Sequence, residues 1–281
     1  MLATARSQQR LFNLFIIAIL VVGVVIAVTP LLYMVATAFK GAAYVQEIPP
    51  RFIPENPTFE NFVDAFTSRN FGRALLNSAG VAVATSILVT ILASMMAYSF
   101  ARFQFRGKKA IFTVLLAMLM IPGVVLLIPQ FILAKNLGLL NSLPGLILVY
   151  SAGPLAFNTF LLRGFFESLP RELEESAVID GANSLTIFLR VMLPLAAPAV
   201  STVAVFSFLG AWDEYVLALN FLTDQNLRTL PIAIANFRGT HATNWGLVFA
   251  GSLTAVVPTV LLFVFFQRYF IQGLTSGAVR G

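Results

Sequence analysis

Charged residues in this chain are gathered into clusters that leave six uncharged runs, each of 22 to 29 residues. A helix needs about 20 apolar residues to cross the ~30 Å hydrocarbon core of a bilayer, so every run is long enough to span a membrane. The runs are continuously apolar and lack the alternation of membrane strands, which favours helices. The runs are Leu11–Phe39, Ala74–Ala101, Ala110–Ala134, Asn136–Leu162, Val191–Trp212 and Gly239–Gln267.

The composition also indicates a membrane protein. Hydrophobic residues make up 58% of the 281 residues and charged residues 11%, whereas soluble domains contain about 45–50% and about 25%. No segment resembles an interdomain linker, so we expect a single all-α transmembrane domain over residues 1–281, with six helices in one bundle. The helices are expected at approximately residues 11–38, 74–101, 110–134, 143–162, 196–222 and 245–268, with outer loops 39–73, 135–142 and 223–244, an inner loop 163–195 and a tail 269–281.

Lysine and arginine residues predict the orientation, because short cytoplasmic loops are enriched in them. With six crossings both termini lie on one side, and that side holds eleven Lys and Arg residues against seven on the other. Four of the eleven lie in the compact loop between Arg102 and Lys109. We therefore expect both termini and the loop 163–195 to be cytoplasmic in a multi-pass protein of the cell (inner) membrane. The net charge of +6 suits anionic inner-leaflet lipids and requires no nucleic acid.

The sequence offers little catalytic or metal-binding chemistry. It contains no cysteine and one histidine, His241, and a lone loop histidine is more often a solvated side chain than a ligand. Gly107 and Lys108 lack the earlier glycine and the following Ser or Thr of a phosphate-binding loop. We therefore expect no metal, no cofactor, no nucleotide site and no enzymatic activity in this chain itself.

The polar loop between residues 163 and 195 predicts two short helices at a bend. Ser168 can cap the start of the first helix, with Pro170 in its first turn, and Gly181 suits a left-handed stop. Pro194 is expected to end the second helix. An apolar stripe on one face of that helix is formed by Leu185, Phe188, Leu189 and Met192. An amphipathic connector lying at the membrane surface would show the same periodicity.

The spacing of particular residues in this loop resembles the cytoplasmic loop of permeases from ATP-binding-cassette importers. The matching positions are Glu175, Ala177, Asp180, Gly181, Ala182, Leu193, Pro194 and Pro198, while Ser176 and Val191 replace the usual Ala and Ile. The resemblance implies that the loop docks a separate ATPase and transmits its motion into the membrane. It also implies two ATPase subunits that bind ATP and Mg²⁺, a second homologous permease subunit as heterodimer partner, and an extracytoplasmic binding protein.

Two further segments are similar to the shorter permease of the maltose- and trehalose-type branch of that family. They are PIAIANFRG in the last outer loop and FIQGLTSGAVRG at the C-terminus. The resemblance implies that the outer loop contacts the sugar-binding protein, with Asn236, Phe237 and Gly239 near its tip. A loop folded back on the bundle is the alternative. We expect the tail, with Gly273, Gly277 and Gly281, to be an extended segment that reaches the ATPases, or else a frayed terminus.

One apolar run is followed at once by acidic residues, in the segment Trp212, Asp213, Glu214 and Tyr215. Acids inside a bilayer are costly unless paired or hydrated, which makes them candidates for a functional site. Aromatic rings beside carboxylates suit a sugar, because rings stack on its apolar faces while acids bond its hydroxyl groups. We therefore expect these residues inside the fifth helix, lining the substrate pathway. An aromatic belt at the membrane interface or subunit packing is the alternative.

Together these features favour a permease subunit that forms half of the pathway of an ATP-driven importer for an oligosaccharide, such as the disaccharides maltose or trehalose. A permease for a non-sugar solute is an alternative. An ion-coupled secondary transporter is another, although it would need no docking loop and would usually carry an internal repeat and ionisable residues in several helices. A membrane-embedded enzyme would need a set of catalytic polar residues. Co-purification with an ATPase would discriminate between these classes.

Overall fold

The computed structural model describes residues 2–41, 51–67, 70–239 and 243–278, and these are almost entirely helical, with no β-strand among them. This confirms the predicted all-α fold class. The major helices are α1 (Leu2–Ala38), α2 (Glu60–Thr67), α3 (Phe71–Arg102), α4 (Lys108–Ala117), α5 (Leu127–Asn136), α6 (Leu143–Ala152), α7 (Leu155–Ser168), α8 (Glu172–Ile179), α9 (Ser184–Ile187), α10 (Leu193–Leu195), α11 (Ala197–Trp212), α12 (Val216–Phe221), α13 (Leu230–Ala235) and α14 (Trp245–Ala278).

Three of the predicted spans correspond to single helices in the structure, and bent pairs of helices are the candidates for the others. Phe12–Ala38, Phe71–Arg102 and Trp245–Gln267 are each long and apolar enough to cross a membrane. Three more spans result if each bent pair crosses once, with bends of 99° between α4 and α5, 51° between α6 and α7, and 81° between α10 and α11. The number of crossings therefore stays a prediction.

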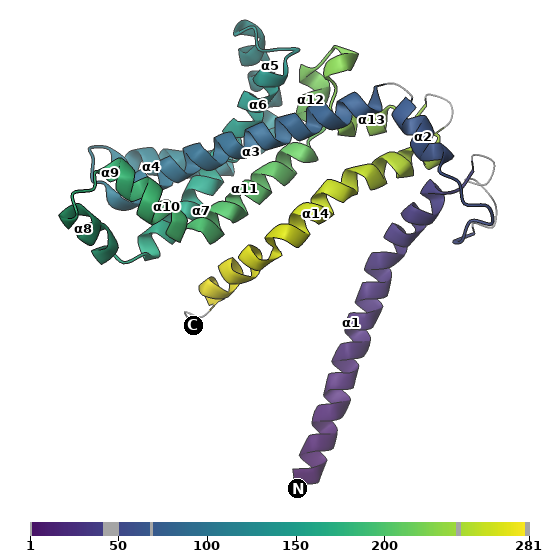
Figure 1. The fold of residues 1–281 in the computed structure, drawn as a ribbon, viewed down its shortest axis with the longest axis horizontal. Helices are drawn as coiled ribbons and strands as arrows, with labels where there is room; N and C mark the ends of the chain where they lie inside the picture. The colour runs from purple at the N-terminus through teal and green to yellow at the C-terminus, as the bar shows by residue number, and fades with distance from the viewer. Residues whose placement is uncertain (1, 42–50, 68–69, 240–242, 279–281) are drawn as a thin grey trace. The chain divides into compact units, whose positions relative to one another are not determined.

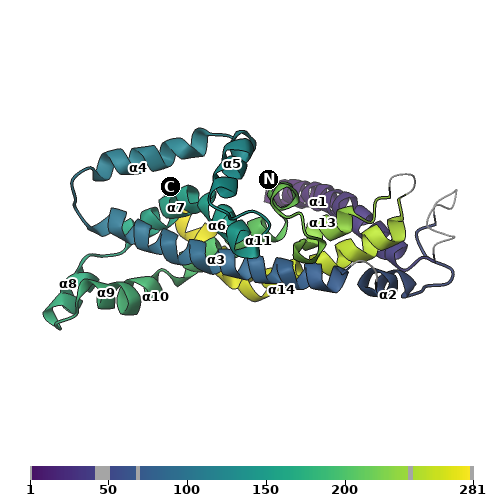
Figure 2. The same cartoon turned by 90° about the horizontal axis from the view of Figure 1, so that it is seen from above.

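Prolines lie at two of these bends. Pro122 lies at the break between α4 and α5, where the preceding Ile121 is extended (φ −87°, ψ 117°). Pro154 lies between α6 and α7. Proline has no N–H to donate and disfavours a helical conformation in the residue before it. Figure 2 shows the sharp turn between α4 and α5.

The chain divides into two compact units, and the larger one comprises residues 70–233 and 257–281. Its centre is α3, which packs along α7, α11 and α6 (Figure 1). Small residues such as Ala82, Ala93 and Ala97 are fully buried on α3 and allow helix backbones to approach closely, as is usual in membrane bundles. The Ser86 hydroxyl donates to the carbonyl of Ala204 on α11 at 2.6 Å.

The smaller unit comprises residues 1–69 and 234–256. Its short helix α2 is amphipathic and buries Asn61 and Ala65. The buried Asn61 amide donates to the carbonyls of Ala38 and Lys40 at 2.9 and 2.7 Å, and so ties α2 to the end of α1. The rings of Phe39, Phe59 and Phe62 pack beside this junction.

Candidate functional site

The loop between α7 and α11 contains α8, α9, the π-helical turn η4 (Phe188–Met192) and α10. Together these four elements, residues 172–195, are called the coupling segment below. They lie beside the end of α3 from which the chain turns into α4 (Figure 1). The segment is therefore attached to the helical core at one end of its central helix.

Gly181 ends α8 in the manner predicted from the sequence. Its φ is +82°, a left-handed conformation that costs other residues about 1–2 kcal/mol. The N–H of Ala182 donates to the carbonyl of Ala177 at 2.9 Å, and that of Gly181 to Val178 at 3.0 Å. This is the Schellman arrangement. Asn183 then caps α9, because its side-chain oxygen accepts from the N–H of Thr186 at 2.9 Å.

Aromatic packing anchors the coupling segment to the core. Ile187, Phe188 and Met192 are buried in one cluster with residues of α3, α7 and α11. The ring of Tyr98 on α3 lies 5.1 Å from the ring of Phe188 and 5.7 Å from that of Phe166 on α7, measured between centroids. Any displacement of η4 must therefore shift the ends of α3 and α7 as well, since close-packed cores do not absorb large local movements.

The apolar stripe expected on the second short helix is only half correct. Phe188 and Met192 are buried, but Leu185 and Leu189 are 62% and 50% exposed. The buried face is centred on Ile187, Phe188 and Met192, and the π-helical turn interrupts the 3.6-residue period on which the prediction rested. Val178 and Ile179 on α8 are also exposed, at 59% and 86%. These four exposed side chains, Val178, Ile179, Leu185 and Leu189, are called the outer apolar surface below.

Six of the residues that matched the family pattern fall into two groups. Ala177, Ala182 and Leu193 are half-buried against the cluster beneath the segment, whereas Glu175, Asp180 and Pro194 are exposed.

Two expected helix boundaries in the coupling segment were wrong, one at the end of the second helix and one at the start of α8. Pro194 does not end the second helix, since α10 contains it and the break follows Leu195.

The start of α8 also differs from the expectation. Ser168 does not cap this helix, which begins at Glu172; its hydroxyl instead donates to the carbonyl of Phe165 at the end of α7, at 2.7 Å.

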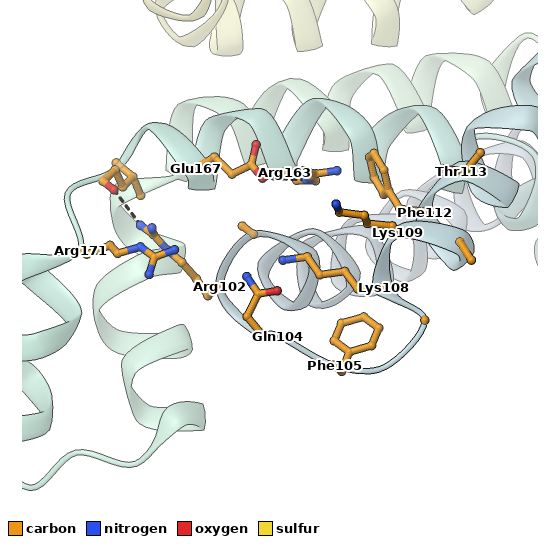
Figure 3. A pocket seen from close by; sticks show the side chains of 14 residues that line it. Arg102, Gln104, Phe105, Lys108, Lys109, Phe112, Thr113, Arg163, Glu167 and Arg171 are labelled. Atoms are coloured by element: carbon orange, nitrogen blue, oxygen red, sulfur yellow. Dashed lines mark hydrogen bonds and ion pairs between the residues drawn. The ribbon is translucent and has the colours of Figure 1, made fainter.

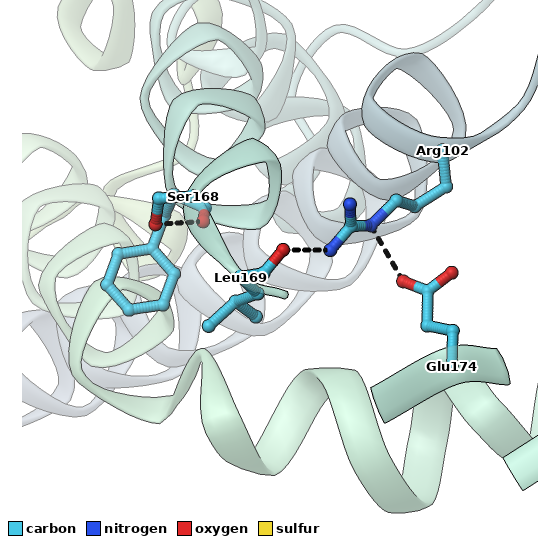
Figure 4. Close-up of polar contacts among 5 residues, drawn as sticks. Arg102, Ser168, Leu169 and Glu174 are labelled. Atoms are coloured by element: carbon cyan, nitrogen blue, oxygen red, sulfur yellow. Dashed lines mark hydrogen bonds and ion pairs between the residues drawn. The ribbon is translucent and has the colours of Figure 1, made fainter. Parts of the chain in front are cut away.

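An ion pair that the sequence did not reveal fixes α8 to α3. Arg102, the last residue of α3, places its Nε 2.7 Å from Oε1 of Glu174. Its guanidinium also donates to the carbonyl of Leu169 at 2.8 Å (Figure 4). Both charged side chains are largely buried, with 6% and 18% exposed. The neighbouring Glu175, which the family pattern had singled out, is exposed.

At the opposite end of α11, the four residues expected to line a pathway lie at a break in the helix, not inside it. α11 ends at Trp212, and α12 begins at Val216. Trp212 is buried and stacks on Phe208, with ring centroids 5.7 Å apart. Asp213 and Tyr215 are exposed, so only these two of the four are presented to the surroundings.

Glu214 is held by hydrogen bonds within the chain. Its carboxylate accepts from the N–H groups of Leu217 and Ala218 at 2.7 and 3.0 Å, which stabilises the first turn of α12. It also accepts from the hydroxyl of Tyr150 on α6. This acid is therefore part of the framework. The sequence reasoning predicted neither this role at the start of α12 nor the partner on α6.

The outer loop and the tail depart from their expected forms. α13 buries Leu230 and Ile232, and Phe237 is buried rather than lying at an exposed tip. Arg238 and Thr243 form an isolated antiparallel β-bridge, and Gly239 is exposed. Residues 240–242, including His241, lie outside the described residues.

At the C-terminus, α14 continues through Gly273 and Gly277 to Ala278, which corrects the extended tail. Gly281 lies outside the described residues.

Comparison with known proteins shows which family the chain resembles in sequence. A family model described as "binding-protein-dependent transport system inner membrane component" matches residues 89–276. The chain is 38% identical over 278 residues to the diacetylchitobiose uptake system permease protein NgcG of Streptomyces coelicolor, covering 98% of this chain and 92% of the relative. It is 35% identical to the trehalose transport system permease protein SugB of Mycobacterium tuberculosis, covering 91% and 93%.

Solved structures show the same fold. A chain in the crystal structure of a bacterial ABC transporter involved in the import of the acidic polysaccharide alginate superposes with a TM-score of 0.85 at 22% identity, covering 94% of this chain and 98% of that chain. The family model spans the C-terminal part of α3, from Val89 onward, and everything from α4 into α14, including the whole coupling segment. This chain therefore belongs to the family of binding-protein-dependent transport system inner membrane components.

Proposed function

We propose that this chain is the permease subunit of an ATP-driven importer for an oligosaccharide, with disaccharides such as maltose or trehalose as the expected size class. Relatives at 33–38% identity are named as permeases for diacetylchitobiose, trehalose and galactooligosaccharides, which supports a sugar substrate. The chain itself is a transport subunit and not an enzyme. ATP and Mg²⁺ are bound by two partner ATPase subunits.

The outer apolar surface of the coupling segment carries this proposal. Val178, Ile179, Leu185 and Leu189 are exposed on short helices beyond the end of the core. Burial of such side chains in a partner is worth roughly 1.5–3 kcal/mol each. We propose that they dock on the ATPase, with Glu175 as the polar anchor, and that both termini lie on this cytoplasmic side.

Motion of the docked ATPase has a physical route into the membrane helices. The coupling segment is joined to α3 by the Arg102–Glu174 ion pair and to α3 and α7 by the rings around Tyr98. Since α10 leads directly into α11 through the 81° bend, displacement of the segment also changes the direction of α11. We propose that this converts ATP-driven movement into alternating access.

On the other side, we propose that the exposed Asp213 and Tyr215 contribute hydroxyl-bonding and stacking contacts to the sugar pathway. A second, different permease subunit supplies the other half of the pathway. An extracytoplasmic sugar-binding protein delivers the substrate, with Asn236 and Gly239 close to its contact. The C-terminal tail contacts the ATPases from the end of α14.

Co-purification from native membranes tests the docking and, with uptake, the function. We expect the tagged chain to bring down an ATPase and a second permease, and Ile179→Asp to abolish ATPase retention and sugar uptake because it places a charge in the docking surface. Ser184→Asp is the matched control, since Ser184 is also exposed at the start of α9. An unmodified chain without ATPase, or full retention in Ile179→Asp, would contradict the proposal.

A further inference from the structure

A pocket of about 1060 Å³ lies where the end of α3, the start of α4 and the connection from α7 to α8 meet. Its wall carries five basic side chains, Arg102, Lys108, Lys109, Arg163 and Arg171, and one acid, Glu167. In Figure 3, Lys108 and Lys109 extend from the start of α4 toward the side on which Arg102 and Arg171 lie. The pocket therefore has a strongly positive wall.

Contacts within the chain neutralise only part of this charge. Arg163 pairs with Glu167, with an Nε–Oε1 distance of 2.8 Å, and Arg102 pairs with Glu174. Lys108 donates to the carbonyl of Phe103 at 2.9 Å, which leaves its charge uncompensated. In the part of the chain that the structure describes, the side chains of Lys109 and Arg171 have neither an ion-pair nor a hydrogen-bond partner.

The first turn of α4 adds to the positive potential. It contains Lys108 and Lys109, has no acidic residue, and begins at Gly107 without a side-chain cap. Lysines are unfavourable there because the helix dipole places partial positive charge at the N-terminus. A bound anion would stabilise both the lysines and the uncapped N–H groups of this turn.

The surroundings of the pocket fit an amphipathic anion. The uncharged run of α3 ends at Ala101 and that of α4 begins at Ala110, so the pocket lies at the boundary of two apolar spans. Phe112 forms part of the wall and lies under the Arg163 guanidinium, whose Cζ is 4.1 Å from the ring centroid. Ile111 and Val114 on α4 are exposed and provide an apolar path along which acyl chains can lie.

We propose that this pocket binds a phosphate group, and that an anionic phospholipid such as phosphatidylglycerol or cardiolipin presents it. Basic pockets between membrane helices on the cytoplasmic side are suited to such headgroups. The phosphate lies among Lys108, Lys109 and Arg171, and the acyl chains lie against α4. The site does not depend on which solute is transported.

Lipid binding to the full importer complex in phosphatidylcholine nanodiscs, with and without phosphatidylglycerol, tests the proposal. We expect the wild-type complex to retain phosphatidylglycerol in native mass spectrometry and to gain thermal stability from it. Lys109→Gln with Arg171→Gln should weaken this affinity about thirtyfold, at about 1 kcal/mol per basic residue near the surface. These two side chains have no partner in the described chain, so the double variant is expected to fold normally.

Arg106→Gln is the matched control. Arg106 lies in the turn between α3 and α4 and is exposed, but it does not line the pocket, and its variant should retain phosphatidylglycerol like the wild type. Equal retention by the double variant, or equal loss in Arg106→Gln, would overturn the site. Inorganic phosphate in place of the lipid distinguishes the source, since equal thermal stabilisation by free phosphate would overturn the assignment to a phospholipid.

Discussion

Two regions of the larger unit each carry a pair of adjacent acids beside a helix break, and in each pair the two acids have different environments. In the coupling segment, Glu174 is buried against Arg102 while Glu175 is exposed. At the break between α11 and α12, Glu214 is bonded to Tyr150 and to the first turn of α12 while Asp213 is exposed.

The difference within each pair separates framework from function. The inward acid is held within the chain, by an ion pair for Glu174 and by hydrogen bonds for Glu214, so its removal leaves partners without their counterpart. The side chain of the outward acid has no ion-pair or hydrogen-bond partner among the described residues and is available to another molecule. We therefore expect substitutions of Glu174 and Glu214 to act on stability, and those of Glu175 and Asp213 to act on assembly or transport.

The largest expected effect is at the buried ion pair. Glu174→Gln should lower the free energy of unfolding by about 3 kcal/mol, because it leaves the buried Arg102 charge without its partner. Glu175→Gln should change it by less than about 0.5 kcal/mol. Thermal unfolding of the purified complex in detergent provides the measurement.

A double variant sharpens this comparison. Arg102→Met with Glu174→Met removes both charges and should recover most of the lost stability, since an apolar pair can replace a buried ion pair at little cost. If Glu174→Gln and Glu175→Gln were equally stable, the buried pair would have no special role in fixing α8 to α3.

The second effect is at the other break. Glu214→Ala removes the acceptor for two backbone N–H groups and for the Tyr150 hydroxyl, and should cost about 2 kcal/mol of unfolding free energy. Asp213→Ala should cost less than about 0.5 kcal/mol. Tyr150→Phe is a useful intermediate, with an expected loss of about 1 kcal/mol. A larger loss in Asp213→Ala than in Glu214→Ala would reverse the interpretation of this pair.

Sequence reasoning succeeded where the determinant is local. Apolar run length predicted helices, and the left-handed preference of glycine predicted the stop at Gly181. It failed where distant segments decide. Nothing near Arg102 indicates that it pairs with Glu174, 72 positions later. The π-helical turn η4 changed which residues of the apolar stripe are buried. A π-helical turn does not follow the 3.6-residue period from which the stripe was predicted.

The third effect concerns the turn that precedes the exposed surface of the coupling segment. Gly181→Val should cost about 1–2 kcal/mol through its left-handed backbone and should uncouple ATP hydrolysis from uptake. No atom lies within 4 Å of a Cβ built at Gly181, so the strain is conformational and not steric. Gly181→Asn, which tolerates this conformation better, should retain most of the uptake. Equal loss in both variants would indicate a direct contact at this position instead.

The smallest effect on stability, and the most selective effect on transport, is expected from Asp213→Asn. The side chain is exposed at the end of α11 and has no hydrogen-bond partner among the described residues, so the unfolding free energy should change by less than about 0.5 kcal/mol. A charged acceptor bonds a hydroxyl about twice as strongly as a neutral one. Loss of the charge should therefore raise the sugar concentration for half-maximal uptake severalfold while ATPase binding stays unchanged.

Asp224→Asn is the matched control, since Asp224 is also exposed but its carboxylate accepts a hydrogen bond from the backbone N–H of Asn226 at 2.8 Å. Unaltered uptake in Asp213→Asn would remove this acid from the pathway and leave Tyr215 as its remaining exposed candidate at the break.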